Sequence, residues 1–313
     1  MDKESVTKKT GKEAVADGTI GYVQRRKLTP GGKFFQFLNG SLLIIFALAC
    51  LLPFLNVLGK SFATPGEILM KSFIIIPETF TLDAYKYVLS TPTIPNAILI
   101  SVIVTLVGTL ISIFFTSLMA YALSRKYLYG RRVINFLVVF TMLFSGGMIP
   151  SFIIVSSLGM MNSLWALILP SCISAYNMII MRNFFSAIPD SLEEAAKLDG
   201  CTDFGVFFKI VLPLSLPSIA TISLFYAVNY WNSYQAAVLY INDADLWPMQ
   251  IQLRQVVLLA TGLATNSSSV DVIPPAQSVK MAVIIIAVIP MLIAYPFVQR
   301  FFVKGVMIGS VKG

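Results

Sequence analysis

The chain has 313 residues, of which 57% are hydrophobic and only 12% are charged, and its net charge is +8. Soluble domains carry about twice this share of charged residues, so the composition excludes an ordinary soluble domain and indicates a membrane protein. The positive charge requires no nucleic acid partner, because the cytoplasmic loops of membrane proteins are enriched in Lys and Arg.

The first 34 residues form a polar segment with eight Lys and Arg residues and no apolar periodicity. This composition predicts a mostly disordered basic tail, whose charge suits the anionic cytoplasmic surface of a lipid bilayer. No apolar stretch precedes Phe34, so a signal peptide is not expected. We therefore expect the folded domain to cover residues 35–313.

Six apolar stretches that lack acidic side chains are long enough to cross a bilayer as helices of about 20 residues. Their expected bounds are 36–59, 95–123, 133–156, 163–182, 214–240 and 280–300. Lys and Arg number 18 on the side that holds both termini and the loops after the second and fourth stretches, against 5 on the other side. The positive-inside rule therefore predicts an all-α, multi-pass integral membrane protein with six transmembrane helices and both termini in the cytoplasm.

The second and third expected spans contain small residues in two different arrangements. In the second span they form a stripe at helical spacing, namely Ser101, Thr105, Gly108, Ser112 and Thr116. Small side chains let membrane helices approach closely, so we expect a packing seam, with a pore-lining seam as the alternative. In the third span, the run Ser145-Gly146-Gly147 and Pro150 predict a break that serves either a substrate pathway or a packing kink.

The segment between the fourth and fifth spans holds five carboxylates. It is too polar to enter the bilayer, because each charge at a helix centre costs about 2.5–3.5 kcal/mol. Ser191 followed by Glu194 predicts a capping box, and Gly200 predicts the left-handed end of that helix. Thr202 is expected to cap a second short helix, which Pro213 interrupts. The prediction is a helix-turn-helix at the membrane surface.

The spacing of seven residues in this loop resembles the EAA loop of permeases from binding-protein-dependent ABC importers. The matching residues are Glu194, Ala195, Ala196, Gly200, Ile210, Leu212 and Pro213. The resemblance implies that residues 183–213 form a coupling loop that docks on a cytoplasmic ATPase, with Glu194 contacting a basic residue there. The implied contact residues are the same seven together with Glu193 and Asp199. An ordinary amphipathic hairpin at the surface is the alternative.

The fifth expected span is the most polar of the six. Helical spacing places Tyr226, Asn229, Tyr230 and Ser233 on one face, and Asn232 follows in the same polar stretch. These residues suit a wall along which a sugar moves, because rings stack on pyranose C–H groups and amides bond hydroxyl groups. The alternative is an aromatic belt at the membrane interface, with Asn joining helices.

No feature of the chain supplies the energy for transport. The expected spans hold no Asp, Glu or His that would bind a coupling ion. Gly32-Lys33 lacks the earlier glycine that a phosphate-binding P-loop requires. We therefore expect ATP and Mg on a separate polypeptide, and no catalytic residue, cofactor or metal site in this chain. Its three cysteines suggest neither a disulfide framework nor a metal cluster.

Further runs resemble the carbohydrate branch of this family, the maltose-type permeases. They lie at residues 159–170, 181–185, 295–297 and 302–313, and the last is most similar to the subgroup assigned to polysaccharide fragments. By this resemblance the outer loop 257–275 reaches into a binding protein. The C-terminal tail then contacts the ATPase through Gly309, Ser310, Val311, Lys312 and Gly313. Ser233 replaces an acidic residue usual in the family, so sugar contacts do not carry over directly.

The resemblance implies a permease subunit that moves an oligosaccharide across a bacterial plasma membrane into the cytoplasm. The implied partners are a homologous second permease, two cytoplasmic ATPase subunits and an extracytoplasmic solute-binding protein; no nucleic acid is expected. Two alternatives are an ABC permease for an amino acid, peptide or ion, and a membrane scaffold whose acidic loop recruits a cytoplasmic protein without transport.

Overall fold

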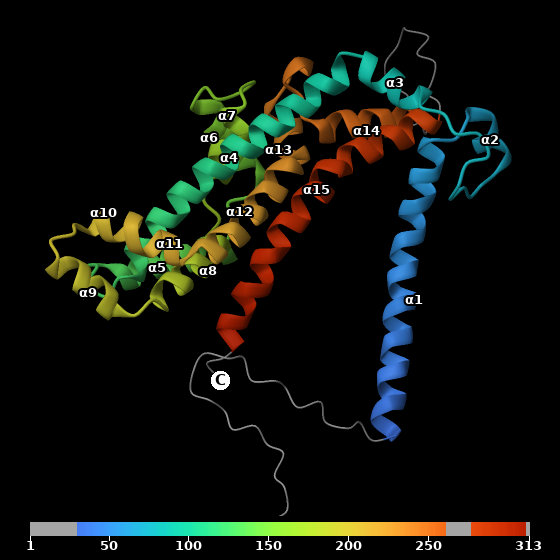
Figure 1. Cartoon of the computed structure of the whole chain (residues 1–313). Helices are drawn as coiled ribbons and strands as arrows, with labels where there is room; N and C mark the ends of the chain where they lie inside the picture. The colour runs from blue at the N-terminus through green and yellow to red at the C-terminus, as the bar shows by residue number, and fades with distance from the viewer. Residues whose placement is uncertain (1–29, 261–276, 311–313) are drawn as a thin grey trace, which may run out of the picture. The chain divides into compact units, whose positions relative to one another are not determined.

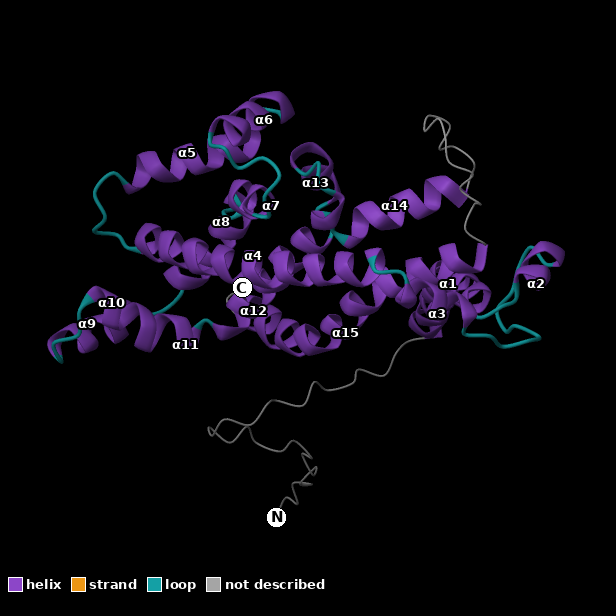
Figure 2. Cartoon of the chain, turned by 90° about the horizontal axis from the view of Figure 1, so that it is seen from above, coloured by secondary structure: helices purple, strands orange, loops and turns teal. Residues whose placement is uncertain are grey.

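The computed structural model describes residues 30–260 and 277–310, and the side chains of residues 30–259 and 277–296. Within these ranges helices joined by loops make up the structure and no strand occurs, as the colours of Figure 2 show. The predicted all-α class is confirmed. The chain forms two units, Met1–Pro53 and Phe54–Gly313, which are described separately.

Figure 1 labels most of the helical elements. In chain order they are α1 (Pro30–Ser61), α2 (Pro65–Met70), α3 (Asp83–Ser90), α4 (Thr93–Ser124), α5 (Arg131–Leu143), α6 (Met148–Ser157), α7 (Trp165–Ile168), η1 (Leu169–Ser171), α8 (Ala175–Ser186), α9 (Asp190–Leu198), α10 (Asp203–Val206), the π-helical segment η2 (Phe207–Val211), α11 (Leu212–Leu214), α12 (Leu216–Trp231), α13 (Tyr234–Tyr240), η3 (Ala244–Leu246), α14 (Met249–Ala260) and α15 (Gln277–Ser310).

The described part of the first unit is the greater part of α1. This helix begins at Pro30, before the expected start of the first span, and proline is favoured at a helix start because its missing N–H is not needed there. Apolar side chains such as Phe34, Ile45 and Phe46 are exposed. A helix that is apolar on all sides suits a lipid environment. Residues 1–29 of the expected basic tail lie outside the described residues.

In the second unit, the chain between α1 and α3 is held by polar contacts. Asn56 Oδ1 accepts a hydrogen bond from the Ile74 backbone N–H at 2.9 Å. The Ile74 carbonyl also lies so close to Gly59 that any Cβ there would collide with it. The short apolar run around Ile74 is therefore a loop pinned to the end of α1, and it does not cross a membrane.

The centre of the second unit is α4, which packs against α12 and α8, while α15 packs against α12, α14 and α3. Figures 1 and 2 show α4, α12 and α15 running close together. The small residues of the predicted stripe are all buried on α4. Gly108 lies against the ring of Tyr230, so the stripe is a packing seam, as predicted.

Length and composition allow three of the described helices to cross a membrane: α1, α4 and α15. Three more spans result if each of three bent helix pairs counts as one, which reaches the predicted six. The pairs bend by 114° between α5 and α6, by 52° between η1 and α8, and by 82° between α11 and α12.

Three expected spans are interrupted: the third, the fourth and the fifth. The third span, 133–156, is broken at residues 144–147, which confirms the break expected at Ser145-Gly146-Gly147; Gly147 has a φ of +86° that other residues rarely adopt. Pro150 does not cause this break, since it lies in the first turn of α6. The fourth span, 163–182, is interrupted at residues 172–174. The fifth span, 214–240, is interrupted at Ser215 and again between Trp231 and Tyr234.

Candidate coupling loop and translocation cavity

The polar loop forms the predicted pair of helices, but its first helix starts differently from the prediction. Pro189 occupies the N-cap position and no side chain caps the helix, so the predicted Ser191–Glu194 capping box is wrong. Asp190 and Glu193 lie in the first turn, where the positive end of the helix dipole stabilises carboxylates. Gly200 has a φ of +81°, which confirms the left-handed end.

The second arm of the loop begins as predicted and ends later than predicted. Thr202 Oγ1 accepts a hydrogen bond from the Gly205 N–H at 3.3 Å, which confirms the cap. The helix does not stop at Pro213, because this residue lies in the first turn of α11, directly after the π-helical segment η2. The chain turns instead at Ser215, before α12.

Ion pairs fasten the loop to itself and to the connection that follows α4. Arg125, which ends α4, forms a buried pair with Glu193. Lys126 contacts Asp190 at 2.8 Å on the exposed surface. Lys197 and Asp203 join the two arms of the loop, also at 2.8 Å.

The charges in these pairs respond to their surroundings. The hydrogen bond from Lys197 lowers the pKa of Asp203, and the hydrogen bond from Lys126 lowers the pKa of Asp190. Burial lowers the pKa of Arg125, because removal from water disfavours the charged form. Arg125 has the most buried side chain of the three paired basic residues, and Glu193 is the carboxylate placed beside it.

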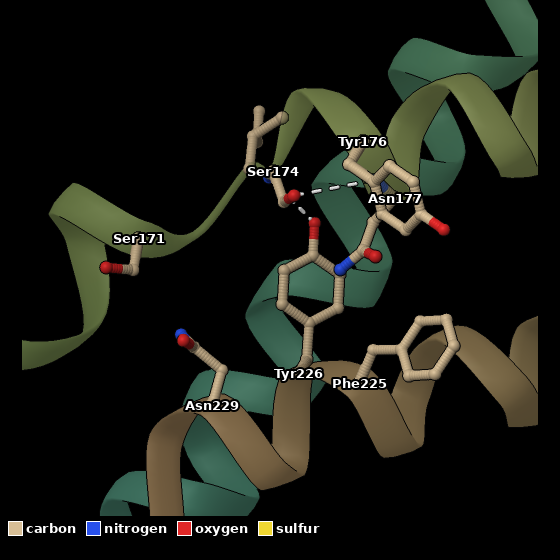
Figure 3. Close-up of a pocket in the computed structure, with 8 residues that line it drawn as sticks. Ser171, Ser174, Tyr176, Asn177, Phe225, Tyr226 and Asn229 are labelled. Atoms are coloured by element: carbon tan, nitrogen blue, oxygen red, sulfur yellow. Dashed lines mark hydrogen bonds between the residues drawn. The ribbon is translucent and has the colours of Figure 1, made fainter. Parts of the chain in front are cut away.

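A cavity of about 430 Å³ lies where α8 and α12 meet. Figure 3 shows the residues that line it: Ser171, Ser174, Tyr176 and Asn177 on one side, and Phe225, Tyr226 and Asn229 on α12. A second cavity, of about 590 Å³, shares Ser171 and Asn229 with the first and extends to the break between α5 and α6. The two hollows are therefore neighbours with a common wall.

Two buried tyrosines of α12 form the framework of this wall. Tyr226 shares a hydrogen bond of 2.7 Å with Thr116 and accepts one from the Ser174 N–H at 2.9 Å. Tyr230 shares a hydrogen bond of 2.8 Å with Ser112 and donates one to the Ile168 carbonyl at 3.1 Å. Their hydroxyl groups fix α12 against α4 and the α7–α8 region.

The family model described as "Binding-protein-dependent transport system inner membrane component" matches residues 112–308. The chain belongs to this family. It is 57% identical to the polygalacturonan/rhamnogalacturonan transport system permease protein YtcP of Bacillus subtilis strain 168, over 90% of this chain and 99% of that protein. It is 50% identical to protein LplC of the same strain, over 91% of this chain and 97% of that protein.

A solved structure agrees with the family assignment. A chain of a bacterial ABC transporter involved in the import of the acidic polysaccharide alginate superposes with a TM-score of 0.80 at 32% identity. The match covers 88% of this chain and 98% of that chain. The protein is therefore a permease component of the inner membrane.

The permease divides the predicted coupling residues between its surface and its interior. The exposed residues are Glu194, Ala195, Asp199, Gly200 and Pro213; Ile210 and Leu212 are half-buried; Glu193 and Ala196 are buried. Leu198 was not predicted as a contact, although its side chain is 89% exposed and lies four residues after Glu194 on the same helix face. The spacing of four residues between Glu194 and Leu198 was the feature of the sequence that could have identified Leu198 as a second contact.

The residues predicted for the pathway have different surroundings in the permease. Asn229 is exposed to both cavities, and Asn232, Ser233 and the run Ser145-Gly146-Gly147 line the second one. Tyr226 lines the first cavity and Tyr230 the second, and the side chains of both are largely buried, with their hydroxyl groups hydrogen-bonded to α4. Tyr176, which was not predicted, also lines the first cavity and is 57% exposed.

The remaining predictions for the permease concern the tail and metal sites. Gly309 and Ser310 lie at the end of α15, and Val311, Lys312 and Gly313 lie outside the described residues, as does 261–276 of the outer loop. In the part of the chain that the structure describes, no group of three or more His, Cys, Asp or Glu residues is placed to hold a metal ion.

Proposed function

We propose that this chain is a permease subunit of an ABC importer that moves a uronate-containing oligosaccharide into the cytoplasm. The observation that carries the proposal is its 57% identity, over nearly the whole of both chains, to a permease named for polygalacturonan and rhamnogalacturonan transport. The likeness to a chain of an alginate importer points to the same chemical class, because both materials are acidic polysaccharides.

The proposed assembly contains a homologous second permease, two cytoplasmic ATPase subunits with ATP and Mg, and an extracytoplasmic solute-binding protein. In this arrangement the six spans place both termini and the coupling loop in the cytoplasm, which agrees with the excess of Lys and Arg on that side. Glu194 and Leu198 are accessible on α9 for a contact with the ATPase. The family description supports the dependence on a binding protein.

The lining of the two cavities suits a polyhydroxylated cargo. Asn229, Asn177 and Ser171 offer amide and hydroxyl groups that donate and accept hydrogen bonds, and Tyr176 offers an exposed ring. Such groups hold sugar hydroxyls in several alternative arrangements. In the proposed mechanism, ATP-driven closure of the ATPases moves the coupling loop and opens this region outward, and sugar then passes from the binding protein into the cavity.

The decisive test is a ligand screen of the cognate solute-binding protein by calorimetry. Oligogalacturonides, rhamnogalacturonan fragments, alginate oligomers and neutral maltodextrins are compared at equal chain length. We expect the acidic oligomers to bind at least about tenfold more tightly, which corresponds to about 1.4 kcal/mol. Equal or weaker binding of every acidic oligomer would overturn the proposed cargo.

A neutral oligosaccharide is the second candidate, and one observation favours it. None of the residues that line the two cavities in the described ranges is charged. A uronate would therefore cross this subunit's cavities without an ion pair. The same screen separates the candidates, since a neutral cargo predicts tighter binding of the maltodextrins or of another uncharged oligomer.

A further inference from the structure

Among the residues whose side chains the structure describes, one buried ion pair, Arg125–Glu193, links the coupling loop to the rest of the permease. The side chains of Arg125 and Glu193 are only 6% and 8% exposed, whereas Lys126 and Asp190, the neighbouring pair, are 79% and 62% exposed. The Arg125 guanidinium also lies over the ring of Tyr121, 4.6 Å from its centre. Its Nε and Nη2 find no hydrogen-bond acceptor in the described part of the chain.

This environment makes the two charges depend on each other. Two ions taken out of water lose much of the solvation that stabilises them, so such a pair adds little net stability but strongly disfavours the loss of one partner. The intact ion pair therefore stabilises one relative position of the two elements that carry its residues. Here these elements are the end of α4 and the first turn of α9.

The Arg125–Glu193 pair connects the loop to α4, the helix that supports the cavity wall. Arg125 ends α4, and the same helix carries Ser112 and Thr116, which hold Tyr230 and Tyr226 in the cavity wall. The chain itself provides two further routes. At its start the loop continues from α8, which lines the first cavity. At its end the chain passes through the π-helical segment η2 and bends by 82° before α12, so an axial displacement of the loop is not passed along this second route in a straight line.

We infer that Arg125 and Glu193 are positioning residues that transmit displacement of the coupling loop to α4 and so to the cavity wall. The inference rests on the proposed function, since it requires an ATPase that moves the loop. It gives the adjacent carboxylates separate roles. Glu194 is exposed and contacts the ATPase, while Glu193 passes the movement inward.

The test uses the complete importer in proteoliposomes, with both permeases, the ATPases and the loaded binding protein. For Glu193→Gln and Arg125→Met, we expect the complex to assemble and its ATP hydrolysis to remain stimulated by the binding protein. The amount of sugar imported per ATP should fall about five- to tenfold, within the range of energetic coupling between distant sites. A residue that only stabilises the fold would lower both activities in parallel.

Two further variants keep the test decisive. Lys126→Gln removes the exposed ion pair between Lys126 and Asp190, which lies in the same first turn of α9 as Glu193. This variant should leave import per ATP unchanged. The double variant Arg125→Met/Glu193→Leu should restore thermal stability, because apolar replacement of a buried pair is tolerated, without restoring import per ATP. If Arg125→Met does not assemble, Arg125→Lys keeps the charge without the planar group and should show the same uncoupling.

The outcomes separate this inference from the proposed function. Wild-type import per ATP in both single variants, or full recovery in the double variant, overturns the transmission role while the importer itself stands. Absence of any import by the wild-type complex with a ligand-bound binding protein overturns the proposed function, and the inference with it.

Discussion

At the scale of single residues, two adjacent carboxylates of the coupling loop lie in opposite environments. Glu193 is buried beside Arg125, and Glu194 is exposed. Consecutive residues of an α-helix point about 100° apart, so one side chain meets the end of α4 while the next faces away. The spacing of the loop identified both residues as candidates. It did not reveal which one is buried, because that depends on Arg125, far away in the sequence.

Charge reversal at Glu194 tests the exposed position. Glu194→Lys should reduce uptake by at least about tenfold and abolish stimulated ATP hydrolysis, while membrane insertion stays normal, because an exposed substitution usually changes stability by no more than about 0.5 kcal/mol. Lys209→Glu, also an exposed charge reversal in this loop, serves as the control and should transport normally. Radiolabelled uptake and membrane fractionation provide the measurements. Normal uptake by Glu194→Lys would contradict the proposed ATPase contact.

At the scale of the elements, the sequence located the apolar segments and the glycine break between α5 and α6, but not the other bends. Apolar length identifies α4 almost to the residue, because every turn of this helix is apolar or small. The break expected at Ser145-Gly146-Gly147 is present, but the two prolines expected to interrupt helices, Pro150 and Pro213, both lie in first turns, where a missing N–H costs little. The actual bends are at Gly147 and Ser215, where the backbone conformation depends on packing as well as on residue type.

The seam between α4 and α12 provides a prediction at this scale. A Cβ at Gly108 would lie 2.8 Å from the ring of Tyr230, whose hydroxyl is anchored by Ser112 and Ile168. Gly108→Ala should therefore separate the helices and lower the free energy of unfolding by about 1–3 kcal/mol. Gly66→Ala, where a Cβ meets open space, is the matched control. Thermal unfolding in detergent compares the two, and equal stability would mean that the seam is loosely packed.

At the scale of the whole molecule, the cavities join segments that no local pattern connects. The sequence indicated Asn229 and the run Ser145-Gly146-Gly147, which do line them. It did not indicate Tyr176 or Asn177, because the fourth span read as a continuous apolar helix. The 52° bend between η1 and α8 brings these polar residues to face α12. Such a site arises from tertiary contacts and becomes visible only in the folded chain.

Tyr176 therefore provides the test of the cavity as a sugar pathway. Tyr176→Ala removes an exposed ring that the cavity presents to a pyranose, and uptake should fall about three- to tenfold while stimulated ATP hydrolysis persists. Tyr176→Phe retains the ring and should retain most of the uptake. Tyr226→Phe instead removes a buried hydroxyl bonded to Thr116 and Ser174, so its main effect should be on stability. If Tyr176→Ala transported normally, the aromatic contact would have to lie on the partner permease, and these cavities would serve packing alone.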